Sequence, residues 1–389
     1  MGVSLYTIFM PSFSERVALF RIQQYLAKYR PYVVMVAGTY GRTLATQALY
    51  HAIARHRHAR IGFGIEKKIG LLRTLVGSKM REIAEIEPDT IMGEVPLVRP
   101  EYAPNIAGNI LPRLLILSHI GAEHIDLFGS KDMVAHEYLA VANTLQADAA
   151  VVLNADEEHL LELREHINHP VITYGMHPDA DIRLTRAKRM QGIFAEFIVH
   201  NVRYEAHFPH LVSKQHVAGM LAGIAGAHAM GIDIQDAIAG LRNLTPPHGS
   251  FSTLPGIKSS RVIDDTADVC PEKLGSSLKS FSLFDPDSRK FIVLGDMDNL
   301  SQYAIKSHEE LGKQAATVAP ILIFVGDMMR HAQAAALKTG TKIDTHHFVT
   351  SADAAAWLPD HIRQNDVVYI TGGKNMEMAK IVKALSFRA

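Results

Sequence analysis

A strand–turn–helix pattern near the start of the chain constrains the fold most. The apolar run 33–37 has the composition of a buried strand, and the turn Gly-Thr-Tyr-Gly-Arg-Thr at 38–43 follows it directly. Apolar residues then recur at helical spacing, at Leu44, Ala48, Leu49, Ala52 and Ile53. A glycine turn between a strand and a helix presents backbone N–H groups and the positive end of a helix dipole, which together bind phosphate. The strict phosphate-loop pattern has a glycine at the position of Val36 and a lysine at that of Arg42, so an ordinary strand–helix turn stays open as an alternative.

Short apolar runs alternate with helical stretches along the rest of the chain. We expect strands at 111–117, 149–153, 261–265, 291–296, 321–327 and 367–372, and helices at 13–29, 131–145 and 214–231. This alternation predicts an α/β fold with mostly parallel, doubly wound sheets, in which ligands bind at the carboxyl ends of the strands. The two prolines and the glycine within 245–249 indicate a linker. We therefore predict a helical lead-in at 1–30, a central domain at 31–245 and a smaller domain at 246–389.

The composition limits the classes of partner. The 40 Lys and Arg residues balance the 40 Asp and Glu residues, so no overall field favours nucleic acid or an anionic membrane. The apolar runs are too short for a transmembrane span, and the first twenty residues lack the pattern of a signal peptide. The single cysteine, Cys270, excludes an internal disulfide and fits a reducing compartment. We expect a cytoplasmic protein, and the sequence leaves its oligomeric state open.

Two further groups of residues have metal-binding chemistry. Thr43, at the end of the turn, offers a hydroxyl of the kind that phosphate loops place on Mg²⁺. The run 119–126, His-Ile-Gly-Ala-Glu-His-Ile-Asp, follows a predicted strand end and contains histidine and carboxylate side chains. These side chains would either bind a divalent ion or form a solvated cluster on the surface, and the sequence leaves both alternatives open. Glu94 is a lone carboxylate within an apolar segment and carries no meaning by itself.

The order of these motifs resembles that of the Mur ligase family, ATP-dependent amide-forming enzymes, and most of all its MurF branch. The matching stretches are 38–43, 120–130, 153–156, 247–249, 263–266 with Pro271, 293–297 with 308–312, and 365–374. The resemblance implies a P-loop-type doubly wound central domain followed by a smaller Rossmann-like α/β ligase domain. In this family a carboxylate attacks the γ-phosphate of ATP, and an amine then displaces phosphate from the resulting acyl phosphate.

The resemblance also implies roles for particular residues. Gly38, Thr39, Gly41, Arg42 and Thr43 would bind the phosphates of ATP. Thr43 and Glu94 would hold one Mg²⁺, and His124 a second, near the incoming carboxylate. Asn154 would lie beside the nucleotide, and Asp265 would reach its ribose from the second domain. Arg42 and His124 are thus the candidate catalytic residues, and the implied substrates are a small carboxylate and the amine of an amino acid or peptide.

The sequence departs from the family pattern where charge is handled. Arg42 stands where the family has its loop lysine, and Tyr138 stands where several Mur ligases have a lysine that is carbamylated. Ser250 stands where the family usually has an arginine that contacts phosphate. The residues before the loop strand are too few for the usual UDP-binding domain of about a hundred residues, so we expect that domain to be absent. A catalytically impaired nucleotide- or partner-binding protein is therefore one alternative to a ligase. A P-loop kinase or hydrolase is another.

Overall fold

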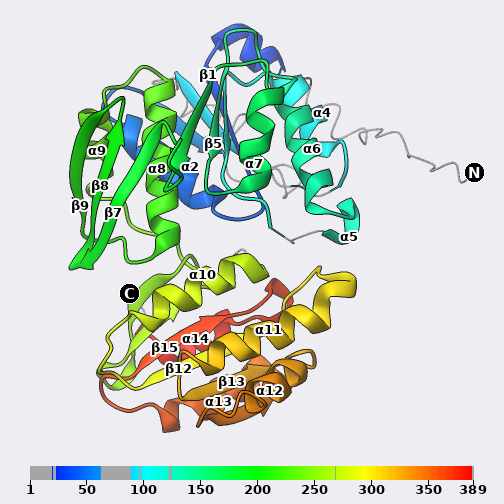
Figure 1. The fold of residues 1–389 in the computed structure, drawn as a ribbon, viewed down its shortest axis with the longest axis vertical. Helices are drawn as coiled ribbons and strands as arrows, with labels where there is room; N and C mark the ends of the chain where they lie inside the picture. The colour runs from blue at the N-terminus through cyan, green and yellow to red at the C-terminus, as the bar shows by residue number, and fades with distance from the viewer. Residues whose placement is uncertain are drawn as a thin grey trace, which may run out of the picture.

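The computed structural model describes residue 20, residues 23–62 and residues 89–387 except 96, 98, 122–124 and 268. Two α/β units lie one above the other in Figure 1, with the helix α10 (Pro271–Ser282) of the second unit facing the first. The predicted lead-in helix falls largely outside the described residues, although residues 23–29 are helical. None of the described helices combines the length and the apolar character needed to cross a lipid bilayer.

The central unit is built on one twisted sheet. Among the described residues its strands follow the order β2-β3-β1-β4-β5-β6-β7-β8-β9. They are β1 (Tyr32–Ala37), β2 (Ala59–Gly62), β3 (Thr90–Val95), β4 (Leu114–Leu117), β5 (Ala150–Asn154), β6 (Val171–Gly175), β7 (Ile182–Met190), β8 (Gly192–Val199) and β9 (Val202–Phe208). All pairings from β2 to β7 are parallel, whereas β7, β8 and β9 pair antiparallel.

Helices cover both faces of this sheet. The helices α2 (Arg42–Ile53), α8 (Lys214–Ala229) and α9 (Ile234–Leu241) pack on one face, and α4 (Tyr102–Ile110), α6 (Lys131–Ala142) and α7 (Glu158–Glu162) on the other. Strand β1 shows why both faces are apolar: Val34 and Val36 join the first core, while Val33 and Met35 join the second. The short helix α5 (Ile125–Phe128) precedes α6.

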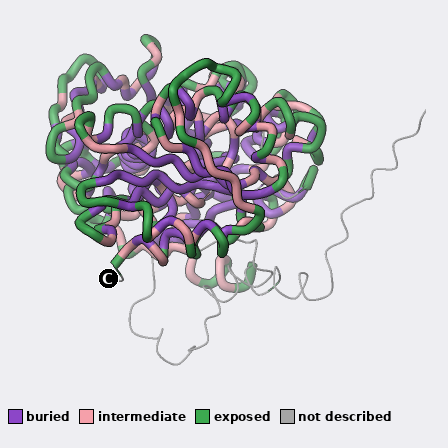
Figure 2. Tube along the Cα trace, turned by 90° about the horizontal axis from the view of Figure 1, so that it is seen from below, coloured by how far each residue is buried: buried purple, intermediate pink, exposed green. Residues whose placement is uncertain are grey.

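The second unit repeats this architecture on a smaller scale. Among the described residues its sheet has the order β10-β11-β15-β12-β13-β14, antiparallel at β10–β11 and otherwise parallel. The strands are β10 (Ser252–Pro255), β11 (Arg261–Asp264), β12 (Lys290–Gly295), β13 (Ile321–Val325), β14 (Asp344–Phe348) and β15 (Val367–Thr371). Helices α10, α11 (Ala304–Ala316) and α12 (Met329–Leu337) pack on one face, and α13 (Ser351–His361) and α14 (Ala379–Leu385) on the other. Figure 2, seen from below, shows buried strands in the interior and exposed loops around them. The predicted α/β fold with mostly parallel sheets is confirmed.

The topology points to one edge of the central sheet. Strand β1 lies between β3 and β4: the chain forms β2 and β3 on one side of β1 and then crosses to form β4 on the other side. Such a switch point leaves a crevice at the carboxyl ends of the strands, where open α/β sheets bind ligands. The turn 38–43 begins directly after the carboxyl end of β1.

Candidate active site

The turn after β1 has a backbone that requires glycine at two positions. Gly38 has φ 143° and Gly41 has φ 80°, in the region of backbone conformation that residues with a Cβ rarely adopt. A Cβ at Gly38 would lie 2.1 Å from the Oγ of Ser118. Gly41 caps α2, and its carbonyl accepts the first hydrogen bond of that helix from the N–H of Ala45 at 3.0 Å. The backbone conformation of the predicted phosphate loop therefore requires glycine at positions 38 and 41.

The residues that follow β4 hold this loop in place. The N–H of Thr39 donates to the carbonyl of His119 at 2.8 Å, and the Oγ of Ser118 donates to the carbonyl of Tyr40 at 2.6 Å. The ring of Tyr40 stacks on that of His119 with 4.3 Å between centroids. Burial lowers the pKa of His119 to about 4, so its imidazole is neutral at physiological pH. Ser118 has no role that the sequence predicts, although the sequence places it at the end of a predicted strand.

The structure brings together two of the three predicted metal ligands. The Oγ of Thr43 donates to Oε2 of Glu94 at 2.9 Å, and Glu94 is only 9% exposed. A hydroxyl and a carboxylate are hard oxygen donors of the kind that Mg²⁺ prefers, so this pair fits the expected ion. His124 lies outside the described residues. Among the residues that are described, no group of three or more His, Cys, Asp and Glu side chains is arranged to hold a metal.

Arg42, within the loop, and Asn154, at the end of β5, are both enclosed by protein. Arg42 is the first residue of α2 and is 8% exposed. Asn154, at the end of β5, is 1% exposed, and its Nδ2 donates to the carbonyl of Ser118 at 2.9 Å. In this arrangement Asn154 supports the segment that holds the loop. Its expected contact with the nucleotide stays a prediction.

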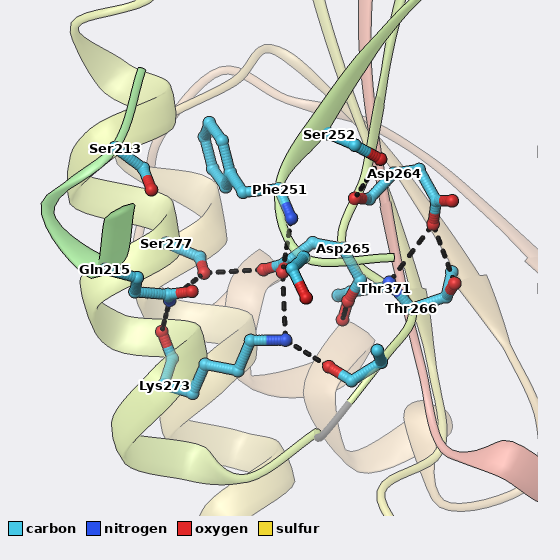
Figure 3. Close-up of polar contacts among 12 residues, drawn as sticks. Ser213, Gln215, Phe251, Ser252, Asp264, Asp265, Thr266, Lys273, Ser277 and Thr371 are labelled. Atoms are coloured by element: carbon cyan, nitrogen blue, oxygen red, sulfur yellow. Dashed lines mark hydrogen bonds and ion pairs between the residues drawn. The ribbon is translucent and has the colours of Figure 1, made fainter. Parts of the chain in front are cut away.

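Asp265 is the centre of a buried polar cluster in the second unit (Figure 3). Its carboxylate is fully buried and accepts hydrogen bonds from the Oγ of Ser277 at 2.5 Å, the hydroxyl of Tyr369 at 2.8 Å and the N–H of Phe251 at 3.1 Å. The Nζ of Lys273 lies 2.9 Å from Oδ1 of the same carboxylate. A contact between Asp265 and a ribose would require some of these partners to be exchanged, and it too stays a prediction.

Hydrogen bonds and an ion pair connect the two units beside the loop. The Nε2 of Gln215, on α8, donates to the carbonyl of Lys273 at 3.2 Å and to the Oγ of Ser277 at 2.7 Å. The N–H of Val212 donates to Nδ1 of His216, so Nε2 carries the proton and donates to the carbonyl of Ser250 at 2.8 Å. Burial lowers the pKa of His216 to about 4, so this imidazole is neutral as well. A further bridge joins Lys131 of α6 to Glu272 of α10 at 2.6 Å.

A small cavity of about 20 Å³ lies between the two units at the loop. Residues of the loop and of α2 form one wall and the segment after β4 another. Tyr174 of β6, residues of α8, Ser250 and Lys273 form the rest. Its described lining residues are Tyr40, Gly41, Thr43, Leu44, Ala45, Ser118, His119, Tyr174, Gln215, His216, Ala218, Gly219, Ser250 and Lys273. The cavity is far smaller than the several hundred Å³ that a nucleotide-sized ligand occupies. The cavity as it stands therefore has no room for a whole nucleotide.

Comparison with known proteins decides the family. The Mur ligase middle domain matches residues 36–227, and the Mur ligase glutamate ligase domain matches residues 251–373. The chain belongs to the Mur ligase family. A UDP-N-acetylmuramoyl-tripeptide–D-alanyl-D-alanine ligase of Bacillus subtilis is 24% identical over 369 residues, which cover 93% of this chain and 77% of the relative.

Solved structures of Mur ligases share the fold. The MurF ligase of Thermotoga maritima in complex with ADP has a TM-score of 0.82 at 18% identity, covering 99% of this chain and 86% of that one. A Mycobacterium tuberculosis folylpolyglutamate synthase complexed with ADP and AMPPCP has a TM-score of 0.65 at 14% identity, covering 94% of both chains. This Mur ligase family member thus shares the fold of those structures. Tyr138 is a fully buried residue of α6.

Proposed function

We propose that this chain is an ATP-dependent ligase that joins a carboxylate to an amine. The observation that carries the proposal is the pair formed by Thr43 and Glu94, 2.9 Å apart beside a glycine loop at the switch point of the sheet. Oxygen donors beside a phosphate-binding turn suit a Mg²⁺–nucleotide complex. The membership in the Mur ligase family supports the same conclusion, and no finding favours a catalytically impaired protein.

The reaction has two displacements. A carboxylate oxygen attacks the γ-phosphorus of ATP and ADP leaves; the nitrogen of a neutral amine then attacks the acyl carbon, phosphate leaves and the amine gives up a proton. Phosphoryl transfer depends on positioning and charge neutralisation, which the loop amides and a Mg²⁺ bound by Thr43 and Glu94 would supply. We keep Arg42 as a phosphate ligand and His124 as a ligand of a second ion as part of the proposal.

The amine is an amino acid or a short peptide in this proposal. The names of the relatives give D-alanyl-D-alanine, L-alanine and 2,6-diaminopimelate beside UDP-N-acetylmuramoyl groups. We therefore infer a role in cell-wall biogenesis with a peptidoglycan-type carboxylate, and a cytoplasmic location where ATP is available.

The test is release of ADP from Mg²⁺–ATP across a panel of carboxylates and amines. The proposal predicts release that requires both substrates, and formation of an amide detected by mass spectrometry. Glu94→Gln should raise the Mg²⁺ concentration needed for half-maximal rate by about tenfold or more, because it removes the charge of a metal ligand. Glu162→Gln, which removes the same charge from the exposed surface of α7, is the matched control. Hydrolysis without any amine would instead indicate a kinase or hydrolase, and ATP binding with no amide product from any pair would contradict the proposal.

A further inference from the structure

Lys273 has an unusual position for a lysine. It lies in the first turn of α10, and its side chain is only 4% exposed. Its Nζ contacts Oδ1 of Asp265 at 2.9 Å and donates to the carbonyl of Ala267. Burying an ammonium group is costly, and pairing it with a carboxylate offsets that cost only in part. The lysine therefore calls for a reason other than folding stability.

Pairing with the carboxylate uses only part of the hydrogen-bonding capacity of the lysine. Asp265 accepts three hydrogen bonds besides that of Lys273, from Ser277, Tyr369 and Phe251. An ammonium group has three N–H donors, and the described contacts of Lys273 use two of them, on Asp265 and Ala267. One donor is thus left for a further acceptor.

The cavity beside the loop shows where that acceptor would lie. Lys273 lines this cavity together with Gly41 and Thr43 of the phosphate loop. It is the only Lys, Arg, Asp or Glu among the described lining residues. The two lining imidazoles, of His119 and His216, are buried and neutral. Ser250 brings no charge to the same wall.

We propose that Lys273 binds the terminal phosphate of ATP from the second domain, opposite the phosphate loop. This inference rests on the proposed function. During transfer, the terminal phosphoryl group carries negative charge spread over three oxygens. A cation on the side away from the loop stabilises that charge. Asp265 then acts as a positioning residue, because it holds the ammonium at the cavity wall.

The experiment separates this role from a structural one by comparing two nucleotides. Calorimetry with Mg²⁺ would give the Kd of ADP and of the β,γ-methylene analogue of ATP for each variant. The ratio of the two Kd values isolates the terminal phosphate, because both ligands share the base, the ribose and two phosphates. The variants are Lys273→Met, Asp265→Asn and the double variant, which removes both buried charges at once. Lys290→Met, a buried lysine of β12 that donates to the carbonyl of Ser282, is the matched control.

The expected results differ between the two roles. If Lys273 binds phosphate, the preference for the analogue over ADP falls by about tenfold or more in Lys273→Met and also in the double variant, since a hydrogen bond to a charged group is worth that much. The preference stays within about twofold of the original in Lys290→Met. Asp265→Asn removes the partner that holds the ammonium at the cavity wall, so it lowers the preference by less than Lys273→Met does. The double variant should also melt above Lys273→Met, because it leaves no uncompensated buried carboxylate.

The opposite pattern would overturn the inference. A double variant with the original preference for the analogue would show that Lys273 only balances Asp265. If the unaltered protein binds both nucleotides and makes amide while Lys273→Met keeps the original preference, only this inference fails. If the unaltered protein binds neither nucleotide, the proposed function fails with it.

Discussion

The contact between α2 and α8 gives a sharp test of how the phosphate loop is supported. Gly223 of α8 faces α2, where an added Cβ would lie 2.7 Å from both the carbonyl carbon and the Cβ of Ala48 and 2.9 Å from the N of Leu49. Two of these three atoms belong to the backbone, so a side-chain rotation cannot relieve the overlap. We expect Gly223→Ala to push α2 away and to move the loop at its amino end.

Two opposing effects determine how Gly223→Ala changes the free energy of unfolding. Alanine in a helix interior is favoured over glycine by about 1 kcal/mol. Overpacking a well-packed core costs about 1–3 kcal/mol. Gly108, an exposed residue of α4 whose added Cβ would meet no atom within 4 Å, provides the same substitution without the overlap. Gly108→Ala should therefore stabilise the protein by about 1 kcal/mol, and the difference between the variants should be about 1–3 kcal/mol.

Differential scanning calorimetry measures this difference. For a domain of this size it corresponds to a gap of about 2–12 °C between the two melting temperatures. Nucleotide affinity should fall in Gly223→Ala and stay unchanged in Gly108→Ala, because only the first variant displaces α2. Equal upward shifts of the melting temperature in both variants would refute the argument that close packing sets the glycine.

Two more predictions concern the loop region. Desolvation raises the pKa of Glu157 to about 7, so the folded chain keeps a proton that the unfolded chain releases, and stability is lost as pH rises from about 4.5 through 7. In urea titrations Glu157→Gln, which mimics the protonated form, should exceed the original stability by about 1–3 kcal/mol at pH 8 and match it at pH 4; parallel pH profiles would contradict this. Gly38→Ala should weaken nucleotide binding by about tenfold or more, because its Cβ meets the Oγ of Ser118 at a backbone φ of 143°. Adding Ser118→Ala should restore part of the affinity, since it removes the overlap but not the backbone strain, and no recovery in calorimetry would argue against the overlap.

The sequence predicted most of the buried parallel strands, but it missed β3, β6 and the apolar strand β8 as well as the polar strands. Apolar runs identified β1, β4, β5, β11, β12, β13 and β15, because strands buried on both faces are continuously hydrophobic. The strand β7 reads Ile-Arg-Leu-Thr-Arg-Ala-Lys-Arg-Met and β14 contains two histidines, so neither has an apolar run. Both are partly exposed, and pairing with neighbouring strands decides their structure. The interruption of β3 by Gly93 and Glu94 concealed that strand in the same way.

The candidate site was predictable only where local pattern sets the geometry. The glycines of the turn and the hydroxyl of Thr43 follow from a local pattern. Glu94 was placed beside Thr43 by resemblance, since 51 positions separate the two residues. The burial of Asp265 and the place of Lys273 at the cavity depend on how the two domains meet, which no local pattern contains. Tertiary packing therefore accounts for what the sequence left open.

The narrowness of the cavity has a consequence for the kinetics of nucleotide capture. About 20 Å³ is free between the loop and α10, so under the proposed function we expect ATP to enter only molecules in which the two domains have already moved apart. The observed association rate should then stop rising at high ATP concentration and level off at the rate of that separation. The bonds of Gln215 and the bridge between Lys131 and Glu272 would set this rate. For the same reason, nucleotide complexes should come from co-crystallisation rather than from soaking crystals of the closed form.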